Sequence, residues 1–207
     1  MNKGFKPPSF FALGFPIGGN PDLRPESSRN IELTATHPLD AAGSHIQMSV
    51  FRTQFEDLVD FDGNTFTNIN RGAIVVNGFE AALNLNLGNR WHAQLCATQL
   101  HIDVRDDLQP LRNQLEQRSS ASVVYDLDAR STIFAAVNHT GTFLDPSNST
   151  GDIQMPKFTT IDNGYAVQWG ALRIHVSIDY LLNKDYEQFV GFPAQDRRLR
   201  TEVRASF

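Results

Sequence analysis

The side chains with the chemistry to bind a metal ion are six histidines and a small group of aspartates. The histidines are His37, His45, His92, His101, His139 and His175. None has the spacing of a helical His-Glu-x-x-His motif, and they fall in stretches predicted to be strands. Asp103, Asp106 and Asp107 could ligate calcium through their oxygens, but we interpret them as part of a solvated loop. The sequence therefore predicts no metal site.

Catalytic chemistry has no support in the sequence either. No serine lies in a Gly-x-Ser-x-Gly elbow, so nucleophilic hydrolysis is not indicated. Cys96 is the only cysteine, which excludes an intrachain disulfide and a site built from several cysteines. We interpret Cys96 as a free thiol with a packing role. We predict a protein that is not an enzyme, with no catalytic residues and no cofactor.

Charge and hydrophobicity argue against two further classes of protein, those that bind nucleic acid and those that span a membrane with helices. The net charge of -5 argues against a nucleic-acid partner. The chain has no run of about 18 apolar residues, so no helix is predicted to span a membrane. The remaining question is which fold the hydrophobic side chains build.

Hydrophobic and polar side chains alternate along most of the chain. In the last segment, Leu199, Val203 and Phe207 share one face, while Arg200 and Arg204 share the other. A period of two predicts β-strands. The predicted strands are 27–38, 45–61, 73–87, 91–105, 117–128, 131–143, 158–169, 171–183 and 198–207.

Some segments depart from regular alternation. The stretches 45–61 and 91–105 change phase partway, which indicates a bulge or a strand that leaves a bilayer. Residues 4–13 are a candidate for one more strand end, but Pro7 and Pro8 make them a poor central strand. We therefore predict nine long antiparallel strands, or ten.

Strand length and the pattern of connections predict a transmembrane β-barrel. Strands of soluble proteins run to about 5–6 residues, whereas tilted membrane strands need about 9–11. Short turns near 40–44, 88–90, 128–130 and 170 alternate with long loops near 62–72, 106–116, 144–157 and 184–197. Short turns at one end and long loops at the other are typical of outer-membrane barrels. A soluble β-sandwich remains the alternative, because it too has antiparallel strands with one apolar face.

Aromatic side chains favour the barrel. Trp91, Tyr125 and Trp169 lie near predicted short turns, and Phe207 ends on the same side. A second group lies toward the long loops and comprises Phe51, Phe55, Phe61, Phe143 and Phe158. Two aromatic belts are expected where rings meet the two headgroup layers. Since charges on the lipid face are costly, Arg198, Arg200, Glu202 and Arg204 are predicted to face the lumen.

Several short motifs occur in a fixed order along the chain. Gly4-Phe5-Lys6-x-Pro8-Ser9 precedes Gly19-Asn20-Pro21-Asp22-Leu23-x-Pro25-Glu26. Asn70-Arg71-Gly72 precedes Gly78-Phe79-Glu80, and Leu181-Leu182-Asn183-Lys184-Asp185-Tyr186 precedes the terminal Phe207. Together these motifs resemble the C-terminal half of TonB-dependent outer-membrane receptors. Within that family they are most similar to siderophore-type and cobalamin-type members. The resemblance covers nearly the whole chain.

The resemblance implies an all-β fold in which residues 1–207 supply about nine or ten of roughly 22 barrel strands. It implies import of a scarce nutrient, such as a metal chelate or cobalamin, with energy from TonB. The family's plug domain has no match in this chain, and the first residues do not read as a signal peptide, so we expect part of a longer protein. The partners implied are the outer-membrane bilayer, TonB, the plug and a small ligand.

The resemblance carries over a set of motif residues with a structural role and no ligand-binding residue. They are Asn20, Pro21, Asp22, Leu23, Pro25, Glu26, Gly78, Glu80, Asn183, Lys184, Asp185, Tyr186 and Phe207. Two other functions stay open. One is a passive porin or adhesin barrel, and the other is a soluble all-β ligand-binding module.

Overall fold

The computed structural model describes residues 1–105, 111–147 and 151–206. Three residues discussed above, Asp106, Asp107 and Phe207, lie outside that part of the chain. Within it the regular elements are almost all β-strands, and α1 (Phe10–Gly14) is the one helix. Ser9 is the N-cap of this helix, because its Oγ accepts a hydrogen bond from the Ala12 N–H at 3.0 Å. No helix in the described ranges is long and apolar enough to cross a membrane.

The main sheet has ten strands in the order β1-β2-β3-β6-β7-β8-β9-β12-β13-β16. Their bounds are β1 Asn2–Lys6, β2 Glu26–Pro38, β3 His45–Glu56, β6 Ile74–Leu87, β7 Trp91–Val104, β8 Gln117–Asp126, β9 Ser131–Thr140, β12 Phe158–Trp169, β13 Leu172–Asp179 and β16 Arg198–Ala205. Neighbours pair antiparallel, as in β7–β8 and β13–β16. The sheet is open, since β1 and β16 are its two edges in the described part of the chain. The all-β, antiparallel prediction is confirmed.

Three long loops contain small two-stranded sheets that the sequence did not predict. β4 (Val59–Asp62) pairs with β5 (Thr67–Asn70), and β10 (Phe143–Ser147) pairs with β11 (Gly151–Met155). β14 (Glu187–Phe189) pairs with β15 (Phe192–Pro193). These three connections therefore contain β-structure.

Two predicted strands end earlier than expected. The single strand predicted at 45–61 is wrong: β3 ends at Glu56 because Asp57 adopts a φ of 57°, and β4 follows as a separate strand. The strand predicted at 171–183 ends at Asp179, because Tyr180 and Asn183 adopt φ values of 56° and 46°. Both breaks are positive-φ residues other than glycine, which alternation does not reveal. At the N-terminus, residues 4–13 divide between β1 and α1.

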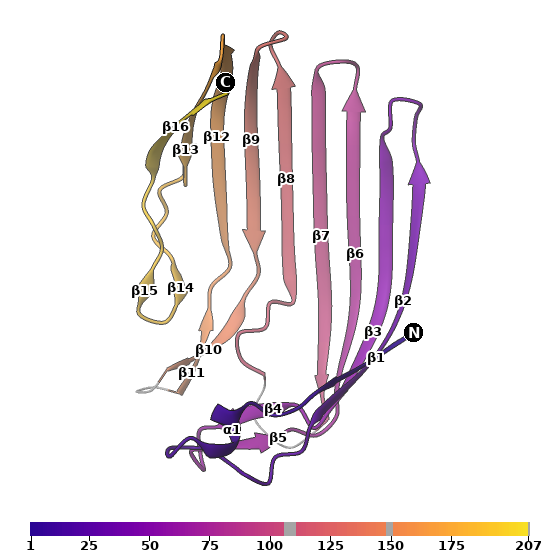
Figure 1. The fold of residues 1–207 in the computed structure, drawn as a ribbon, viewed down its shortest axis with the longest axis vertical. Helices are drawn as coiled ribbons and strands as arrows, with labels where there is room; N and C mark the ends of the chain where they lie inside the picture. Colours follow the sequence, from indigo (N-terminus) through magenta and orange to yellow (C-terminus); the bar gives the residue numbers. More distant parts are fainter. Residues whose placement is uncertain (106–110, 148–150, 207) are drawn as a thin grey trace. The chain divides into compact units, whose positions relative to one another are not determined.

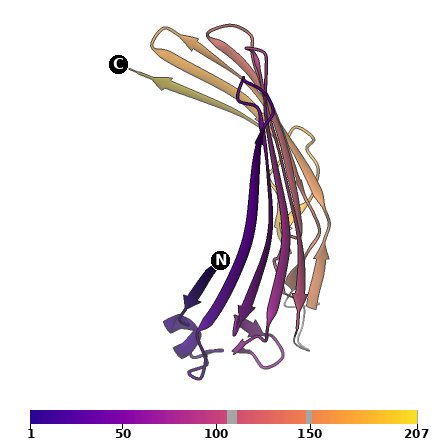
Figure 2. The same cartoon turned by 90° about the vertical axis from the view of Figure 1, so that its right-hand side faces the viewer.

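The chain forms two compact units. Unit 1 comprises Met1–Thr34, Ser49–Phe79 and Leu100–Leu111, and unit 2 comprises Ala35–Met48, Glu80–Gln99 and Arg112–Phe207. In unit 2 all four short turns gather at one end, and the hairpins β10–β11 and β14–β15 lie toward the other (Figure 1). The strands of unit 2 fan out toward β16, as Figure 2 shows. The predicted sorting of short turns and long loops holds within this unit.

The sheet of unit 2 has one apolar and one polar face. On the apolar face, Ile174 pairs with Val203 and Ile178 with Leu199. Apolar side chains on this face are exposed: Leu95 is 44% exposed and Leu199 is 70% exposed. No second sheet of the described chain covers this face in unit 2, which argues against a soluble sandwich.

The polar face of unit 2 carries the charged side chains. Arg173 pairs with Arg204, His175 with Glu202, and Asp179 with Arg198. The arginines therefore lie on the face opposite the apolar side chains, as predicted. This follows from the alternation along each strand, because successive side chains point to opposite faces.

An aromatic belt borders the apolar face at the short turns. Trp91 and Tyr125 are a cross-strand pair with ring centroids 4.4 Å apart. Tyr165 and Trp169 share the parity of this face, and the Trp169 ring is 73% exposed. The second predicted group behaves differently. Three of its phenylalanines contact other rings: Phe61 contacts Phe66, Phe143 contacts Phe189 and Phe158 contacts Tyr186.

Candidate ligand-facing loops and lumen wall

The motif residues of unit 1 form a hydrogen-bonded loop cluster around asparagines. Asn20 Nδ2 donates to the Asn68 carbonyl oxygen at 2.9 Å, and its Oδ1 accepts the Asp22 N–H at 3.0 Å. Asn68 Nδ2 donates in turn to the Gly18 carbonyl at 2.7 Å. The Asn-Pro-Asp turn is thus fastened to β5, and Leu23 behind it is buried.

Asn70 is the centre of the same cluster. Its Oδ1 accepts the Arg24 N–H at 2.7 Å, and its Nδ2 donates to the carbonyls of Arg24 at 2.9 Å and Asp57 at 2.7 Å. Arg24 Nη2 also lies 2.6 Å from Asp57 Oδ1. The side-chain amide of Asn70 therefore joins Arg24 to Asp57, the positive-φ residue that follows β3.

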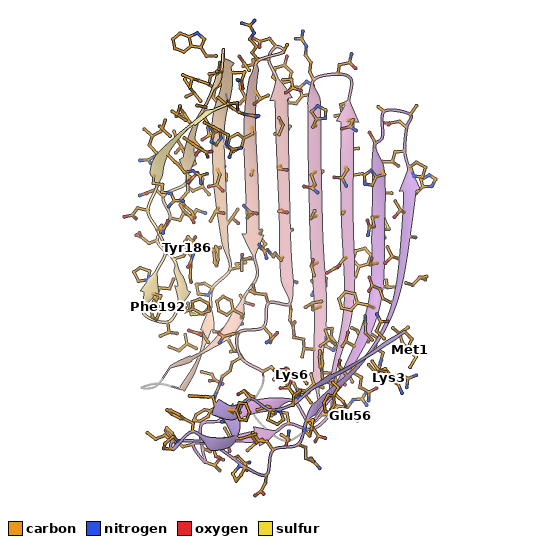
Figure 3. All side chains as sticks on the ribbon, in the orientation of Figure 1. Met1, Lys3, Lys6, Glu56, Tyr186 and Phe192 are labelled. Atoms are coloured by element: carbon orange, nitrogen blue, oxygen red, sulfur yellow. The ribbon has the colours of Figure 1, made fainter. Side chains whose placement is uncertain are left out.

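Two ion pairs complete the unit 1 cluster. Glu26 Oε1 accepts the Val59 N–H at 3.1 Å, and Lys6 Nζ lies 3.1 Å from Glu26 Oε2. Arg71, which is 3% exposed, pairs through Nη1 with Asp60 Oδ2 at 2.8 Å. Figure 3 shows Lys3 and Lys6 on β1, the edge strand of this unit. Glu26 therefore acts as a structural anchor here.

Gly78 and Glu80 lie on β6 with different surroundings. A Cβ on Gly78 would collide with the Phe51 ring, so this position admits only glycine while the ring stays in place. Glu80 is exposed. Pro21 and Asp22 are exposed at the turn, and Pro25 immediately precedes β2.

In unit 2, the second motif lines a cavity of about 670 Å³ at the loop end. Lys184, Asp185 and Tyr186 contribute to its wall, facing Ile153 and Met155 from β11. The Tyr186 ring stacks on Phe158 with centroids 4.1 Å apart. Burial raises the pKa of the Tyr186 phenol, so it stays protonated at neutral pH and can donate a hydrogen bond. Figure 3 shows Tyr186 and Phe192 on the segment that carries β14 and β15.

Hydrogen bonds from backbone N–H groups to side-chain oxygens hold the segments around this cavity. Asn183 Oδ1 accepts the Arg197 N–H at 2.8 Å, and Asp162 Oδ1 accepts the Tyr180 N–H at 2.8 Å. The carboxylate of Asp145, which is 5% exposed, accepts the Val190 N–H at 2.6 Å. The β14–β15 hairpin is thereby fastened to β10. Asp145 was missed in the sequence, where one aspartate in a long loop carries no signal.

The polar face of unit 2 carries a charge cluster at the end of β13. Asp179 Oδ2 lies 3.0 Å from Arg198 Nε, and Asp179 Oδ1 lies 3.5 Å from Arg200 Nη2. Ser177 Oγ donates to Asp179 Oδ1 at 3.1 Å. Among the described residues, no group of three or more histidine, cysteine, aspartate or glutamate side chains is placed to hold a metal ion.

The motif residues therefore fall into two loop clusters, one in each unit. Asn20, Leu23 and Glu26 pack in unit 1, and Asn183 to Tyr186 in unit 2. Residues 2–197 match a family described as TonB dependent receptor-like, beta-barrel. The chain belongs to this family of TonB-dependent receptor β-barrels. The family and its homologues are outer-membrane proteins.

Individual relatives in this receptor family are longer than this chain. It is 29% identical over 189 residues to the vitamin B12 transporter BtuB of Vibrio vulnificus (strain YJ016), covering 89% of this chain and 30% of that protein. The ferric-catecholate import receptor Fiu of K12 E. coli, in its closed form, superposes with a TM-score of 0.78 at 17% identity, covering 97% of this chain and 31% of that one. The copper transporter OprC superposes with a TM-score of 0.81 at 14% identity, covering 99% and 36%. At these identities the structures show a shared fold, and the chain spans about a third of each relative.

Proposed function

We propose that residues 1–207 form the C-terminal part of the barrel of an outer-membrane active transporter in a bacterium. The whole protein would bind a scarce nutrient and import it with energy delivered by TonB. The observation that carries this proposal is the family match over residues 2–197. The two-faced sheet of unit 2 supports it, since an open apolar face bordered by Trp91 and Tyr125 suits a bilayer.

The chain's partners follow from this role. The apolar face would contact the bilayer, and the polar face would enclose a plug domain encoded by the remainder of the protein. Energy coupling would pass through the plug to TonB, and the chain itself would catalyse no reaction. Because the chain spans 30% of its B12-transporting relative, plug and first strands would come from sequence outside residues 1–207.

The ligand class is a metal chelate, a siderophore or a cobalamin. Relatives named as a vitamin B12 transporter, a ferric-catecholate receptor and a copper transporter motivate this range. The loop cavity beside Tyr186 is our candidate contact region for the ligand, since it combines an open wall with protonated phenol, ammonium and carboxylate groups.

The test is uptake by the receptor that contains this chain. It would be expressed in a bacterium lacking its own importers, with and without TonB, and offered labelled ferric siderophore, cobalamin and copper in parallel. We expect uptake of one ligand, abolished without TonB. Uptake that continues unchanged without TonB would favour the passive porin, and surface binding without uptake would favour the adhesin.

A further inference from the structure

A cavity of about 320 Å³ lies on the apolar face of unit 2. Strands β6, β7, β8 and β9, which lie side by side in the sheet (Figure 1), contribute to its wall. Two cross-strand rows on this wall are Leu95, Ala121 and Val137, followed by Ala97, Ser119 and His139. Both rows share the parity of Trp91 and Tyr125, so the cavity lies on the face that the aromatic belt borders.

Leu83 on β6 extends the wall of the cavity on the same face. Asn86 Oδ1 lies 2.9 Å from Nδ1 of His92, and His92 points away from the face that carries its neighbour Trp91. Asn86 is therefore on the polar face. Leu83, three residues before it on β6, is on the apolar face, because successive side chains alternate.

The cavity is a hollow between small and large side chains. Ala97 and Ala121 each contribute a single methyl group, whereas Leu83, Leu95 and Val137 around them are longer. Side chains that border a hollow lose van der Waals contacts unless other atoms occupy it. In a bilayer, the atoms that meet this face are those of hydrocarbon chains.

The cavity changes character along the strands. Toward the short turns, the row of Leu95, Ala121 and Val137 is apolar. Toward the loops, Ser119 and His139 add a hydroxyl and an imidazole, and His139 Nδ1 lies 2.9 Å from Thr159 Oγ1. The cavity is thus apolar along its length and able to hydrogen-bond at its loop-side end.

The position of this hydrogen-bonding end matches a bilayer boundary. Ala97 lies six residues after Trp91 on β7, which is roughly 20 Å along the strand at about 3.4 Å per residue. The apolar band of an outer-membrane barrel is about 25 Å tall, and its strands tilt by about 35–45°. The cavity therefore lies in the half of the band nearer the loops.

We propose that this cavity binds one acyl chain of a membrane lipid in the leaflet on the loop side. The carbonyl that joins the chain to its headgroup accepts a hydrogen bond at Ser119 or His139, and the hydrocarbon follows the apolar row toward Leu95. The inference rests on the proposed function, which makes this face the lipid-facing wall, and assigns a discrete lipid site to one place on it. Packing in the hollow and the hydrogen bond at its end distinguish this site, because hydrocarbon contact alone is equally available elsewhere in the bilayer.

Photolabelling of the receptor that contains this chain, reconstituted in phospholipid vesicles, tests the proposal. The probe is a phosphatidylcholine with a diazirine in one acyl chain, and peptide mass spectrometry locates the label. The reference is Leu199, which is exposed on the same face and also close to a loop. Labelling around Ala97 and Ser119 should exceed that at Leu199 at least about threefold, the ratio expected for a typical hydrogen bond within a membrane. It should also saturate as the probe fraction rises, while labelling at Leu199 rises in proportion.

Two variants separate the hollow from its hydrogen-bonding end. Ala97→Leu fills the hollow and should reduce labelling there to the level at Leu199, and Ser119→Ala should reduce it about threefold. Ala93→Leu is the matched control, because Ala93 is on the same strand and face but is not among the described residues that line the cavity. Ala97 is exposed, so its substitution should leave the sheet intact, and a heat-modifiability gel checks each variant.

The outcomes that would contradict the proposal are distinct from those that would contradict the proposed function. Labelling at the cavity that equals labelling at Leu199, or equal labelling in Ala97→Leu and Ala93→Leu, would overturn the lipid site alone. Displacement of the probe by palmitate as effectively as by unlabelled phospholipid would assign the cavity to a free fatty acid and overturn it too. Absence of label from the whole apolar face would overturn the lipid-facing wall, and the site with it.

Discussion

The ring of Phe51 lies directly over Gly78, in the space that a Cβ on Gly78 would occupy. β3 and β6 are neighbours in the sheet, so an aromatic side chain on one strand covers a glycine on the next. Gly78 was singled out by its resemblance to a family motif, and the structure supplies a physical reason for glycine there. The ring shields the bare backbone, and the missing Cβ makes room for the ring.

Gly78→Val should destabilise unit 1. The added methyl groups force the Phe51 ring to move, which costs about 1–3 kcal/mol as in other overpacked sites. Urea unfolding of the refolded chain in detergent would measure the change. Gly14→Ala is the control, because nothing lies within 4 Å of a Cβ at Gly14. Equal stability of both variants would mean that the Phe51 ring does not constrain this position.

Asn70→Ala should loosen the loop cluster of unit 1. The substitution removes the acceptor of the Arg24 N–H and the donor to two carbonyls, and we expect a loss of about 1–3 kcal/mol. Limited proteolysis should then cut within residues 15–25 several times faster. Asn64→Ala is the matched control, because within the described ranges Asn64 makes a hydrogen bond only through its backbone N–H, to Asp62. Similar cleavage rates for the two variants would contradict the proposal that the Asn70 side chain holds this loop cluster together.

The turn before β3 should depend on the charge of Asp40. A hydrogen bond from the Ser44 side chain, with help from backbone N–H groups of Ser44 and Ala42, lowers the pKa of the Asp40 carboxyl below 3.8. Because the folded pKa is lowered, this contribution to stability is present above pH 3.8 and is lost as pH falls through the folded value. A carboxyl-carbon NMR titration should give a midpoint below 3.8, and Ser44→Ala should move it upward. A midpoint at 3.8 or above in the parent chain would contradict this hydrogen-bond network.

The sequence predicted the strands of unit 2 well, because sustained alternation of apolar and polar side chains is typical of long strands with one apolar face. The belt at Trp91 and Tyr125 was also predictable, since both rings border predicted short turns. The sequence could not reveal the breaks at Asp57 and Tyr180, which depend on single positive-φ residues. Nor could it reveal the small loop sheets, whose pairing depends on contacts made within the folded loops.

The candidate sites were predictable to different degrees. Asn20 and Tyr186 were found through motifs, but their hydrogen-bond and stacking partners came only from the structure. The gathering of Arg90, Arg130 and Arg173 around one cavity at the short turns of unit 2 was missed, because these residues lie far apart in sequence and meet only through strand pairing. Residues that gather from several strands leave no local signal.

Residues 1–207 expressed alone should form inclusion bodies and should show no uptake when exported. β16 is an edge strand whose side chains are all exposed, and an unpaired apolar edge promotes aggregation. The test is expression with an added secretion signal, outer-membrane fractionation and a heat-modifiability gel. A monodisperse monomer without detergent would instead support the soluble module, and a heat-modifiable, ion-conducting species would support a self-sufficient small barrel.

The central claim is that the apolar face of unit 2 contacts lipid while its polar face lines an aqueous lumen. Gln94 and Leu95 are adjacent on β7 and point to opposite faces, pairing with Ser122 and Ala121. Spin labels placed at each position in turn, in the chain refolded into lipid vesicles, report their surroundings through collisions with oxygen or with a water-soluble nickel chelate. We predict that the label at 95 is relaxed mainly by oxygen, from the bilayer, and the label at 94 mainly by the nickel chelate. Equal access of the nickel chelate to both labels, or the reverse pattern, would contradict the membrane-spanning account.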